Sequence, residues 1–387
     1  MVACHAANAT DLGRVPFVDR RDPPPYRELT APERNVFDLG HAVFNTHWLA
    51  ADTPRAARRD GLGPLFNATS CDACHNEGAR ARGPKEAGSL PVGMVVRLVR
   101  PDGTTDPRYG ELLSTSALDG FVPDAAVTVE YAERHGTYPD GVSWQLRVPA
   151  YRIDAWRDGP MPADTIIQPR LAPALFGVGL LDEVGDGDQD GRFGWQAHAL
   201  SVRDQTTKAF ALEMGLTNDD VARDDCVAEA CRVAPNGGIP EVQTELLAAV
   251  LAFQRWLAVP VSAARVESEA KLFEETGCAV CHQRTLQSAS GEIAPYTDLL
   301  IHDLGPGLAD RDAAGRIVQT FWRTAPLWGI GYTTPTSPHP TYLHDGRARS
   351  LEEAVLWHSG DAGGARTRFE QLTANERRRL LDWIATL

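Results

Sequence analysis

The sequence lacks a long apolar run and is poor in positive charge. No stretch approaches the roughly 20 apolar residues that a membrane-spanning helix needs, so none is predicted. Lys and Arg together number 38 against 52 Asp and Glu, which gives a net charge of −14. This acidity argues against nucleic acid as a partner, because phosphate binding needs a basic surface. It favours a basic or neutral partner protein or a small neutral substrate, although solubility alone would also explain it.

Cysteine is also scarce, since seven residues are too few for a disulfide-stapled scaffold of this length. Four of the seven lie in two Cys-x-x-Cys-His motifs, at 71–75 and 278–282. Cys226 and Cys231 are five residues apart in a predicted loop and would pair in an oxidising compartment. The alternative for these two is a pair of free buried thiols.

The two Cys-x-x-Cys-His motifs predict covalently attached haem c. Two cysteines at this spacing can both reach the vinyl groups of one porphyrin, and the adjacent His then faces the iron. The spacing alone also suits zinc or a redox dithiol. Zinc needs four ligands, however, and each motif supplies three. We therefore expect two haems. The thioether bonds would be formed by Cys71, Cys74, Cys278 and Cys281, and the iron ligands would be His75 and His282.

Haem c is attached outside the cytoplasm, so the sequence predicts a periplasmic protein. The segment Met1-Val2-Ala3-Cys4 is similar to the end of a bacterial lipoprotein signal, in which the Cys is lipidated after cleavage. We accordingly expect a mature chain that carries a lipid anchor at Cys4.

The chain of 387 residues is too long for one ordinary core, so two domains are expected. Residues 1–29 are polar and Pro-rich and predict an extended tether. Residues 30–258 and 262–387 each contain one haem motif and predict two cytochrome c-like domains. Short β-branched runs between turn residues predict a small antiparallel insertion at about 88–152. The predicted fold class is therefore mainly α, with a β insertion in the first domain.

Several further segments resemble those of a known family. The sequence at 342–355, which contains His-Asp-Gly, resembles the C-terminal signature of bacterial di-haem cytochrome c peroxidases. With the segments at 60–64, 296–310 and 327–331, it is more closely similar to the di-haem oxidoreductase family. That peroxidase-related group is often labelled thiol-oxidoreductase-like. Dithiol chemistry is not expected, because both Cys-x-x-Cys pairs are assigned to haem.

The resemblance implies a sixth iron ligand for the second haem. In the peroxidases this ligand lies 14 residues beyond the His of His-Asp-Gly, a position that His358 occupies here. The peroxidases usually have Met there, so a bis-histidine iron of lower potential is implied. A surface His at a helix C-terminus is the alternative. His344 itself is then expected to bond a propionate or to orient a ligand, or to be a plain loop residue.

For the first haem, the resemblance implies a Trp between the haems, a Gln ten residues later and a distal Glu. Trp195 and Gln205 have this spacing, and Glu213 follows after 8 residues where the peroxidases have 10. A distal carboxylate can take a proton from hydrogen peroxide and return it to the departing oxygen. The alternatives are a core Trp, a helix-surface Gln and a solvated Glu.

The acidic loop at 186–191 resembles the start of a calcium-binding EF-hand, but its twelfth position is Ala197 where Glu is required. A looser calcium site remains an alternative to a polar turn.

Together these features predict a di-haem oxidoreductase of the peroxidase type. Electrons from a small cytochrome or similar donor protein would enter at the second haem and reduce a peroxide, such as hydrogen peroxide, at the first. The alternative is a non-catalytic di-haem electron carrier in which both irons have six ligands.

Overall fold

A computed structural model of the chain describes residues 12–53, 59–185, 191–261 and 267–387. The predicted lipid anchor at Cys4 and all but the last residue of the predicted calcium loop at 186–191 lie outside these residues. None of the described helices is both long enough and apolar enough to cross a membrane.

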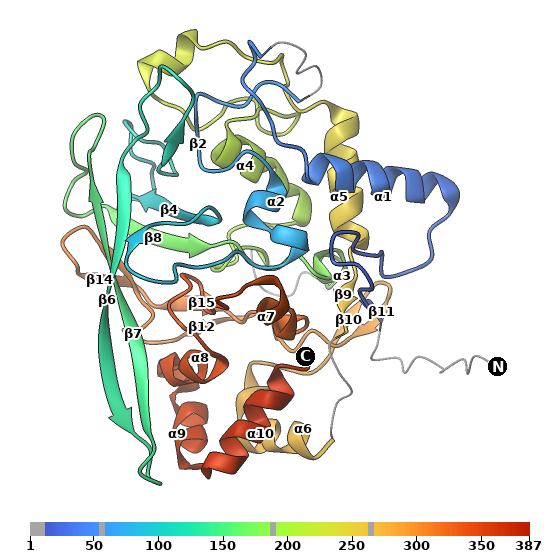
Figure 1. Cartoon of the computed structure of the whole chain (residues 1–387), viewed down its shortest axis with the longest axis vertical. Helices are drawn as coiled ribbons and strands as arrows, with labels where there is room; N and C mark the ends of the chain where they lie inside the picture. The colour runs from blue at the N-terminus through green and yellow to red at the C-terminus, as the bar shows by residue number, and fades with distance from the viewer. Residues whose placement is uncertain (1–11, 54–58, 186–190, 262–266) are drawn as a thin grey trace.

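The described part of the chain contains short helices and many short strands (Figure 1). The α-helices are α1 (Ala31–Phe44), α2 (Cys71–Cys74), α3 (Val178–Asp182), α4 (Val202–Met214), α5 (Thr244–Trp256), α6 (Glu267–Thr276), α7 (Thr333–Thr336), α8 (Leu351–Trp357), α9 (Gly363–Gln371) and α10 (Ala374–Ile384). The 3-10 helices are η2 (Asn76–Gly78), η3 (Glu229–Val233), η4 (Cys278–Val280), η5 (Ile330–Tyr332) and η6 (Gly360–Ala362). The strands are β1 (Arg14–Val15), β2 (Leu65–Phe66), β3 (Gly88–Ser89), β4 (Met94–Val99), β5 (Ser116–Ala117), β6 (Ala126–Thr137), β7 (Ser143–Asp154), β8 (Ile166–Leu171), β9 (Val259–Pro260), β10 (Leu286–Ser288), β11 (Gly291–Ile293), β12 (Ile301–Asp303), β13 (Asp310–Asp312), β14 (Ile317–Gln319) and β15 (Phe321–Arg323).

The prediction of a mainly α fold is wrong, because 29% of the chain is helical and 21% is strand, arranged in several sheets. The C-terminal half alone contributes the six strands β10 to β15, each of three residues. An alternating pattern needs four or more residues to be recognised in a sequence, so strands this short leave no signal. The division into domains at about residue 260 remains a prediction.

The largest sheet joins distant parts of the chain in the strand order β14-β13-β8-β4. Strands β4 and β8 pair antiparallel over six residues, from Met94 opposite Leu171 to Val99 opposite Ile166. Strand β13 then adds to β8 from the C-terminal half, with Arg311 opposite Ile167. This sheet therefore holds a segment that follows the first Cys-x-x-Cys-His motif next to a segment that follows the second.

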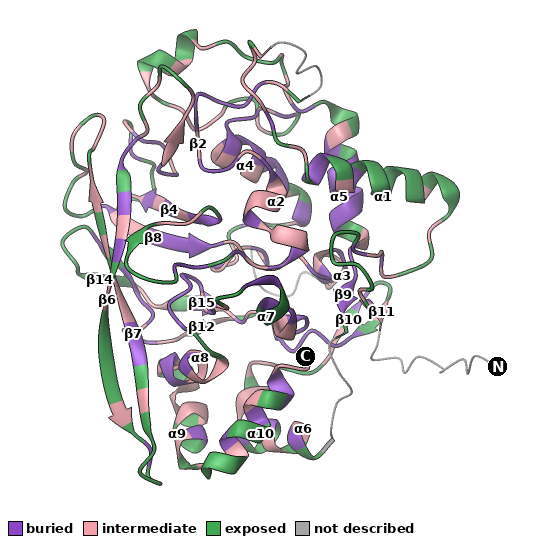
Figure 2. Cartoon of the chain, viewed as in Figure 1, coloured by how far each residue is buried: buried purple, intermediate pink, exposed green. Residues whose placement is uncertain are grey.

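A long hairpin of β6 and β7 runs along one side of the molecule, past both the upper and the lower groups of helices (Figure 1). The end of the hairpin that contains the turn is largely exposed (Figure 2). Tyr138, in the turn, and Leu146, on β7, are nevertheless buried in the same hydrophobic cluster as Phe369, Leu380 and Trp383 of the C-terminal helices. The hairpin therefore contributes to the core of the C-terminal half.

The two ends of the N-terminal half are packed together. Residues 12–29, which the sequence predicted to belong to a tether, include β1, which pairs parallel with β9. The amide of Tyr26 donates a hydrogen bond to the carbonyl of Trp256 at 2.8 Å. Cys226 and Cys231 form the predicted disulfide.

Helices α1 and α5 approach closely at Gly40. A Cβ atom added to this glycine would lie 2.0 Å from the carbonyl oxygen of Ala249 on α5. Phe37 and Phe44 on α1 flank this point, and both contact the ring of Phe253. The glycine thus sets the distance between the two helices.

We expect Gly40→Ala to lower the free energy of unfolding by about 1–3 kcal/mol, because the added methyl group must push two packed helices apart. Gly363→Ala is the matched control. Gly363 is also helical, with φ −60°, and a Cβ there would meet nothing within 4 Å. The control should be neutral or more stable by up to about 1 kcal/mol, because alanine loses less entropy in a helix. Urea unfolding followed by circular dichroism measures both, and equal effects would contradict this account of the helix contact.

Candidate functional site

One cavity of about 1170 Å³ contains both Cys-x-x-Cys-His motifs. Its lining is mainly apolar and comes from both halves of the chain. The residues with chemical interest that line it are Cys71, Cys74, His75, Trp195, Gln205, Glu213, Cys278, Cys281, His282, His344 and His358. Every site residue predicted from the sequence therefore faces the same cavity.

The first motif is held by a short capped helix. The side chain of Ser70 accepts a hydrogen bond from the amide of Ala73 and so begins α2. His75 ends this helix, and its Nδ1 lies 2.7 Å from the carbonyl oxygen of Pro173. Because Nδ1 donates to that carbonyl, Nε2 is the nitrogen left for a metal ion. Burial lowers the pKa of His75 to about 4, so the ring is neutral, as a metal ligand must be.

The second motif has the same arrangement. The Nδ1 atom of His282 lies 3.0 Å from the carbonyl oxygen of Tyr296, and burial together with the nearby His358 lowers its pKa to about 4. His358, directly after α8, has its Nδ1 atom 2.7 Å from the carbonyl oxygen of Ala354. All three imidazoles are thus fixed through Nδ1 by backbone carbonyls.

His282 and His358 face each other across a gap that fits a metal ion. Their ring centroids are 6.5 Å apart, and the rings are inclined by 54°. Two metal–nitrogen bonds of about 2 Å each, plus the radii of the two rings, give a similar separation. His358 caps the C-terminal end of α8, is partly buried and lines the cavity. Its place opposite a motif histidine is the one that a sixth iron ligand would occupy.

All four motif cysteines are unpaired in the structure. Burial raises the pKa values of Cys71 and Cys278 to about 12, so these thiols are poor nucleophiles and poor redox dithiols. In the described residues, the possible zinc ligands cluster at one place, where Cys281, Asp298 and His302 lie within 4.8 Å of one another. A fourth protein ligand is absent from that cluster, so a closed structural zinc site is not formed there.

Glu213 lies in the last turn of α4 and lines the cavity close to the first motif. The helix ends at Gly215, whose φ of 64° favours glycine. Oε2 of Glu213 is buried and has no hydrogen-bond partner among the described residues. Burial, opposed by Arg97 and reinforced by Asp225 and Glu111, raises the pKa of Glu213 to about 7. This side chain can therefore exchange a proton near neutral pH.

Gln205 lies on the same helix, about 12 Å before Glu213 at 1.5 Å per residue. Its Oε1 atom points toward Gly194, which precedes Trp195. Both side chains line the cavity, but the structure does not bring Gln205 and Glu213 into contact.

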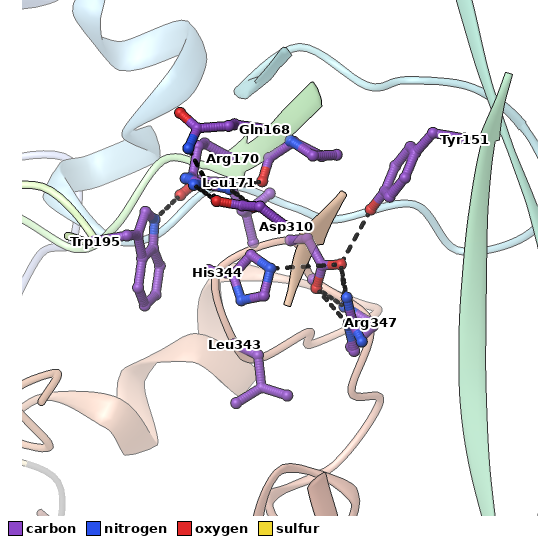
Figure 3. Close-up of polar contacts among 12 residues, drawn as sticks. Tyr151, Gln168, Arg170, Leu171, Trp195, Asp310, Leu343, His344 and Arg347 are labelled. Carbon is purple, nitrogen blue, oxygen red and sulfur yellow. Dashed lines mark hydrogen bonds and ion pairs between the residues drawn. The ribbon is translucent and has the colours of Figure 1, made fainter. Parts of the chain in front are cut away.

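Trp195 is fixed by hydrogen bonds to Leu171, which Figure 3 shows, and to Arg323. Its Nε1 donates to the carbonyl oxygen of Leu171 at 2.8 Å, and the amide of Leu171 donates to the carbonyl oxygen of His344 at 2.6 Å. The carbonyl oxygen of Trp195 accepts from the amide of Arg323 at 2.9 Å. The indole is thus hydrogen-bonded to the end of β8, and the backbone of the same residue is hydrogen-bonded to β15.

His344 is buried and stacked, not a plain loop residue. Its ring lies 3.8 Å from that of Trp322 at an angle of 15°. Burial lowers its pKa to about 3, so the ring is neutral. The next residue, Asp345, accepts hydrogen bonds from Arg347 at 3.0 Å and from Tyr151 at 3.2 Å (Figure 3). Burial alone would raise the pKa of Asp345, but the guanidinium of Arg347 holds it well below its usual range.

Two cavity-lining arginines had no role in the sequence-based interpretation. Arg80 follows His75 by five residues, and Arg323 lies in an Arg-Thr-Ala-Pro-Leu sequence that echoes Arg170 to Leu175. This repeated sequence can be recognised without a structure, but it does not indicate whether Arg170 or Arg323 would lack a carboxylate partner.

Comparison with known proteins gives one family match. The family described as "Di-haem oxidoreductase, putative peroxidase" matches residues 183–387, which is more than half of the chain. No curated protein matches. Among solved structures, the chain is similar to one titled hydrazine synthase of Kuenenia stuttgartiensis, pressurised with xenon, at 13% identity and a TM-score of 0.40. That comparison covers 100% of this chain and 98% of the other. On the family match, the chain belongs to the di-haem oxidoreductase family.

Proposed function

We propose that this protein is a periplasmic c-type di-haem oxidoreductase that takes electrons from a small donor protein and reduces a peroxide. The observation that carries this proposal is the inequality of the two motifs within one cavity. His358 faces the ring of His282 at 6.5 Å, whereas the carboxyl group of Glu213, with an unpartnered oxygen, lies near the motif of His75. One motif is thus equipped for electron transfer and the other for proton transfer.

The residues present fit two covalently attached haems. Cys71, Cys74 and His75 would hold one, and the second motif would hold the other together with His358. The free thiols, the neutral imidazoles with Nε2 available and the apolar cavity are the chemistry that haem c requires. When bound, the two haems would supply the electron storage and the binding place for peroxide that the chain itself lacks.

Glu213 would handle the protons of the reaction. Reduction of hydrogen peroxide consumes two electrons and two protons and gives two molecules of water. The Glu213 carboxylate would accept a proton from one peroxide oxygen and deliver it to the departing one. A pKa near the working pH suits such a residue, because both protonation states are populated.

Trp195 and Gln205 would have supporting roles. Trp195 would be the aromatic contact through which electrons pass between the two sites, since it lines the cavity that contains both motifs. Gln205 would orient water or substrate at the wall of the cavity that it lines.

The chemistry of haem c supports the location, because its attachment takes place outside the cytoplasm. We propose a lipid anchor at Cys4, because Val2-Ala3-Cys4 is similar to the end of a bacterial lipoprotein signal. The net charge of −14 favours a donor protein with a basic or neutral contact surface.

Haem attachment is tested first by mass spectrometry of protein made with an intact haem-maturation system. We expect an added mass of two porphyrins that survives denaturation, because thioether bonds are covalent. In the reduced protein, carbon monoxide should bind at one haem, since His358 occupies the other. An unmodified mass would overturn the proposal. If neither haem binds carbon monoxide, the alternative of a non-catalytic electron carrier would be favoured.

Glu213→Gln tests proton transfer. We expect kcat/KM for hydrogen peroxide to fall by about 10²- to 10⁴-fold, because the amide cannot accept the proton. In the wild type, kcat/KM should rise with pH through about 7, as Glu213 ionises, and this rise should vanish in the variant.

Asp225→Asn is the control for that experiment. Asp225 is also a buried carboxyl group with a pKa raised to about 7 by burial, and it accepts hydrogen bonds from the amides of Glu111 and Leu112. It does not belong to the cavity lining, so the control should keep a rise of kcat/KM with pH. The midpoint of that rise should lie at lower pH than in the wild type, because the charge of Asp225 helps to raise the pKa of Glu213. Undiminished activity in Glu213→Gln would remove this residue from the mechanism.

A further inference from the structure

Six arginines line the cavity within the described residues, and they differ in their partners: Arg80, Arg97, Arg170, Arg323, Arg366 and Arg368. Three of them form ion pairs, in each case with a carboxylate of the chain: Arg97 with Glu111, Arg170 with Asp310 and Arg366 with Glu370. The other three have no carboxylate partner among the described residues. Arg368 is exposed, whereas Arg80 and Arg323 are largely shielded from solvent. A guanidinium buried without an anion is costly, so Arg80 and Arg323 need a separate explanation.

Arg80 is fixed above Trp195. Its guanidinium carbon lies 5.7 Å from the centroid of the Trp195 ring and 5.7 Å from that of Tyr342. Nη2 donates to the carbonyl oxygen of Leu343 at 2.7 Å, whereas Nε is buried and has no hydrogen-bond partner in the part of the chain that the structure describes. Burial lowers the pKa of Arg80 to about 10, and no carboxylate opposes that shift.

Arg323 approaches the same tryptophan from its backbone side. Its Nε donates to the carbonyl oxygen of Gly194 at 2.9 Å, and its amide donates to the carbonyl oxygen of Trp195 at 2.9 Å. The remaining contact is a longer one, from Nη1 to the carbonyl oxygen of Thr324 at 3.2 Å. Burial alone lowers the pKa of Arg323 to about 10. Two unpaired cations thus flank Trp195.

Arg368 lies in a different part of the cavity. Its Nε donates to the carbonyl oxygen of Thr276 at 2.9 Å, and its guanidinium is in direct contact with Gly277, next to Cys278. In a c-type haem, the thioether bonds and the two propionates are on opposite edges of the porphyrin. Arg368 would therefore lie at the cysteine edge of a haem held by the second motif, away from the propionates of that haem.

We propose that Arg80 and Arg323 bind the propionate carboxylates of the haems beside Trp195. Two haems bring four carboxylates into the cavity, and these are the anions that the two guanidinium groups lack. The planar fork of arginine matches a carboxylate in a two-point contact. This inference rests on the haem part of the proposed function and adds the residues that set where the propionate edges lie and how their charge is balanced.

The experiment compares two substitutions at each arginine in haem-loaded protein. Arg80→Gln and Arg323→Gln remove the charge, whereas Arg80→Lys and Arg323→Lys keep it and lose the fork. Haem content is measured by mass, the midpoint potentials by redox titration and the propionate bending modes by resonance Raman spectroscopy.

We expect each Gln variant to lower the midpoint potential of at least one haem. The ferric form carries one more positive charge than the ferrous form, so loss of a nearby guanidinium cation favours the ferric form. A shift of about tenfold in the ferric-to-ferrous ratio corresponds to 59 mV for one electron. The propionate bending mode should move as well. The Lys variants should keep most of the potential but still move the bending mode, since lysine is a point charge. They also retain a cation in the fold, so they test the proposal if a Gln variant does not fold.

Two outcomes overturn the proposal separately from the proposed function. Haem-loaded Gln variants with unchanged midpoint potentials would show that these two guanidinium groups do not balance the charge of the haem propionates. Lys variants whose bending modes equal those of the wild type would show that no propionate is held by a fork. Protein without any attached haem would overturn the proposed function together with this inference.

Discussion

The backbone carbonyls that accept the Nδ1–H groups of His75, His282 and His358 are the constraint on which the site depends. An imidazole can rotate about two side-chain bonds, and a hydrogen bond at one nitrogen fixes the direction of the other. For His282 and His358 the acceptors are close in the sequence, at Tyr296 and Ala354. For His75 the acceptor is Pro173, 98 residues away, so the direction of its Nε2 depends on tertiary structure.

The sheet supplies that tertiary structure. Strand β8 ends at Leu171, two residues before Pro173, and its six-residue pairing with β4 fixes where the chain passes the first motif. Strand β13 on the other side of β8 carries Asp310, whose carboxylate pairs with Arg170 at 2.6 Å. Loss of one partner of such a buried pair leaves an uncompensated charge, and this makes the arrangement resistant to change. The two halves are therefore joined by the same strands that position His75.

The local parts of the site could be predicted from the sequence, and the parts that depend on long-range contacts could not. The two Cys-x-x-Cys-His motifs and the spacing that indicated His358 are short patterns, and the structure brings their residues to one cavity. The fold class was predicted incorrectly because strands such as β13 have three residues and pair with segments more than 140 positions away. The raised pKa of Glu213 depends on burial and on Asp225 and Glu111, which no spacing reveals. Likewise, Arg80 and Arg170 look equivalent in the sequence, although within the described residues Arg170 pairs with a carboxylate and Arg80 does not.

The charge beside Trp195 decides what that residue can do. A tryptophan that gives up an electron becomes a cation, and a guanidinium 5.7 Å from its ring opposes this change, the more so where the surroundings are apolar. With Arg80 and Arg323 unpaired, Trp195 would be harder to oxidise than a tryptophan in water. Carboxylates placed against both guanidinium groups would cancel most of that opposition without moving the ring, since its hydrogen bond to Leu171 is independent of them. With haem propionates bound there, the charge balance at these two arginines would therefore set both the potential of the neighbouring haems and the ease with which an electron passes between them.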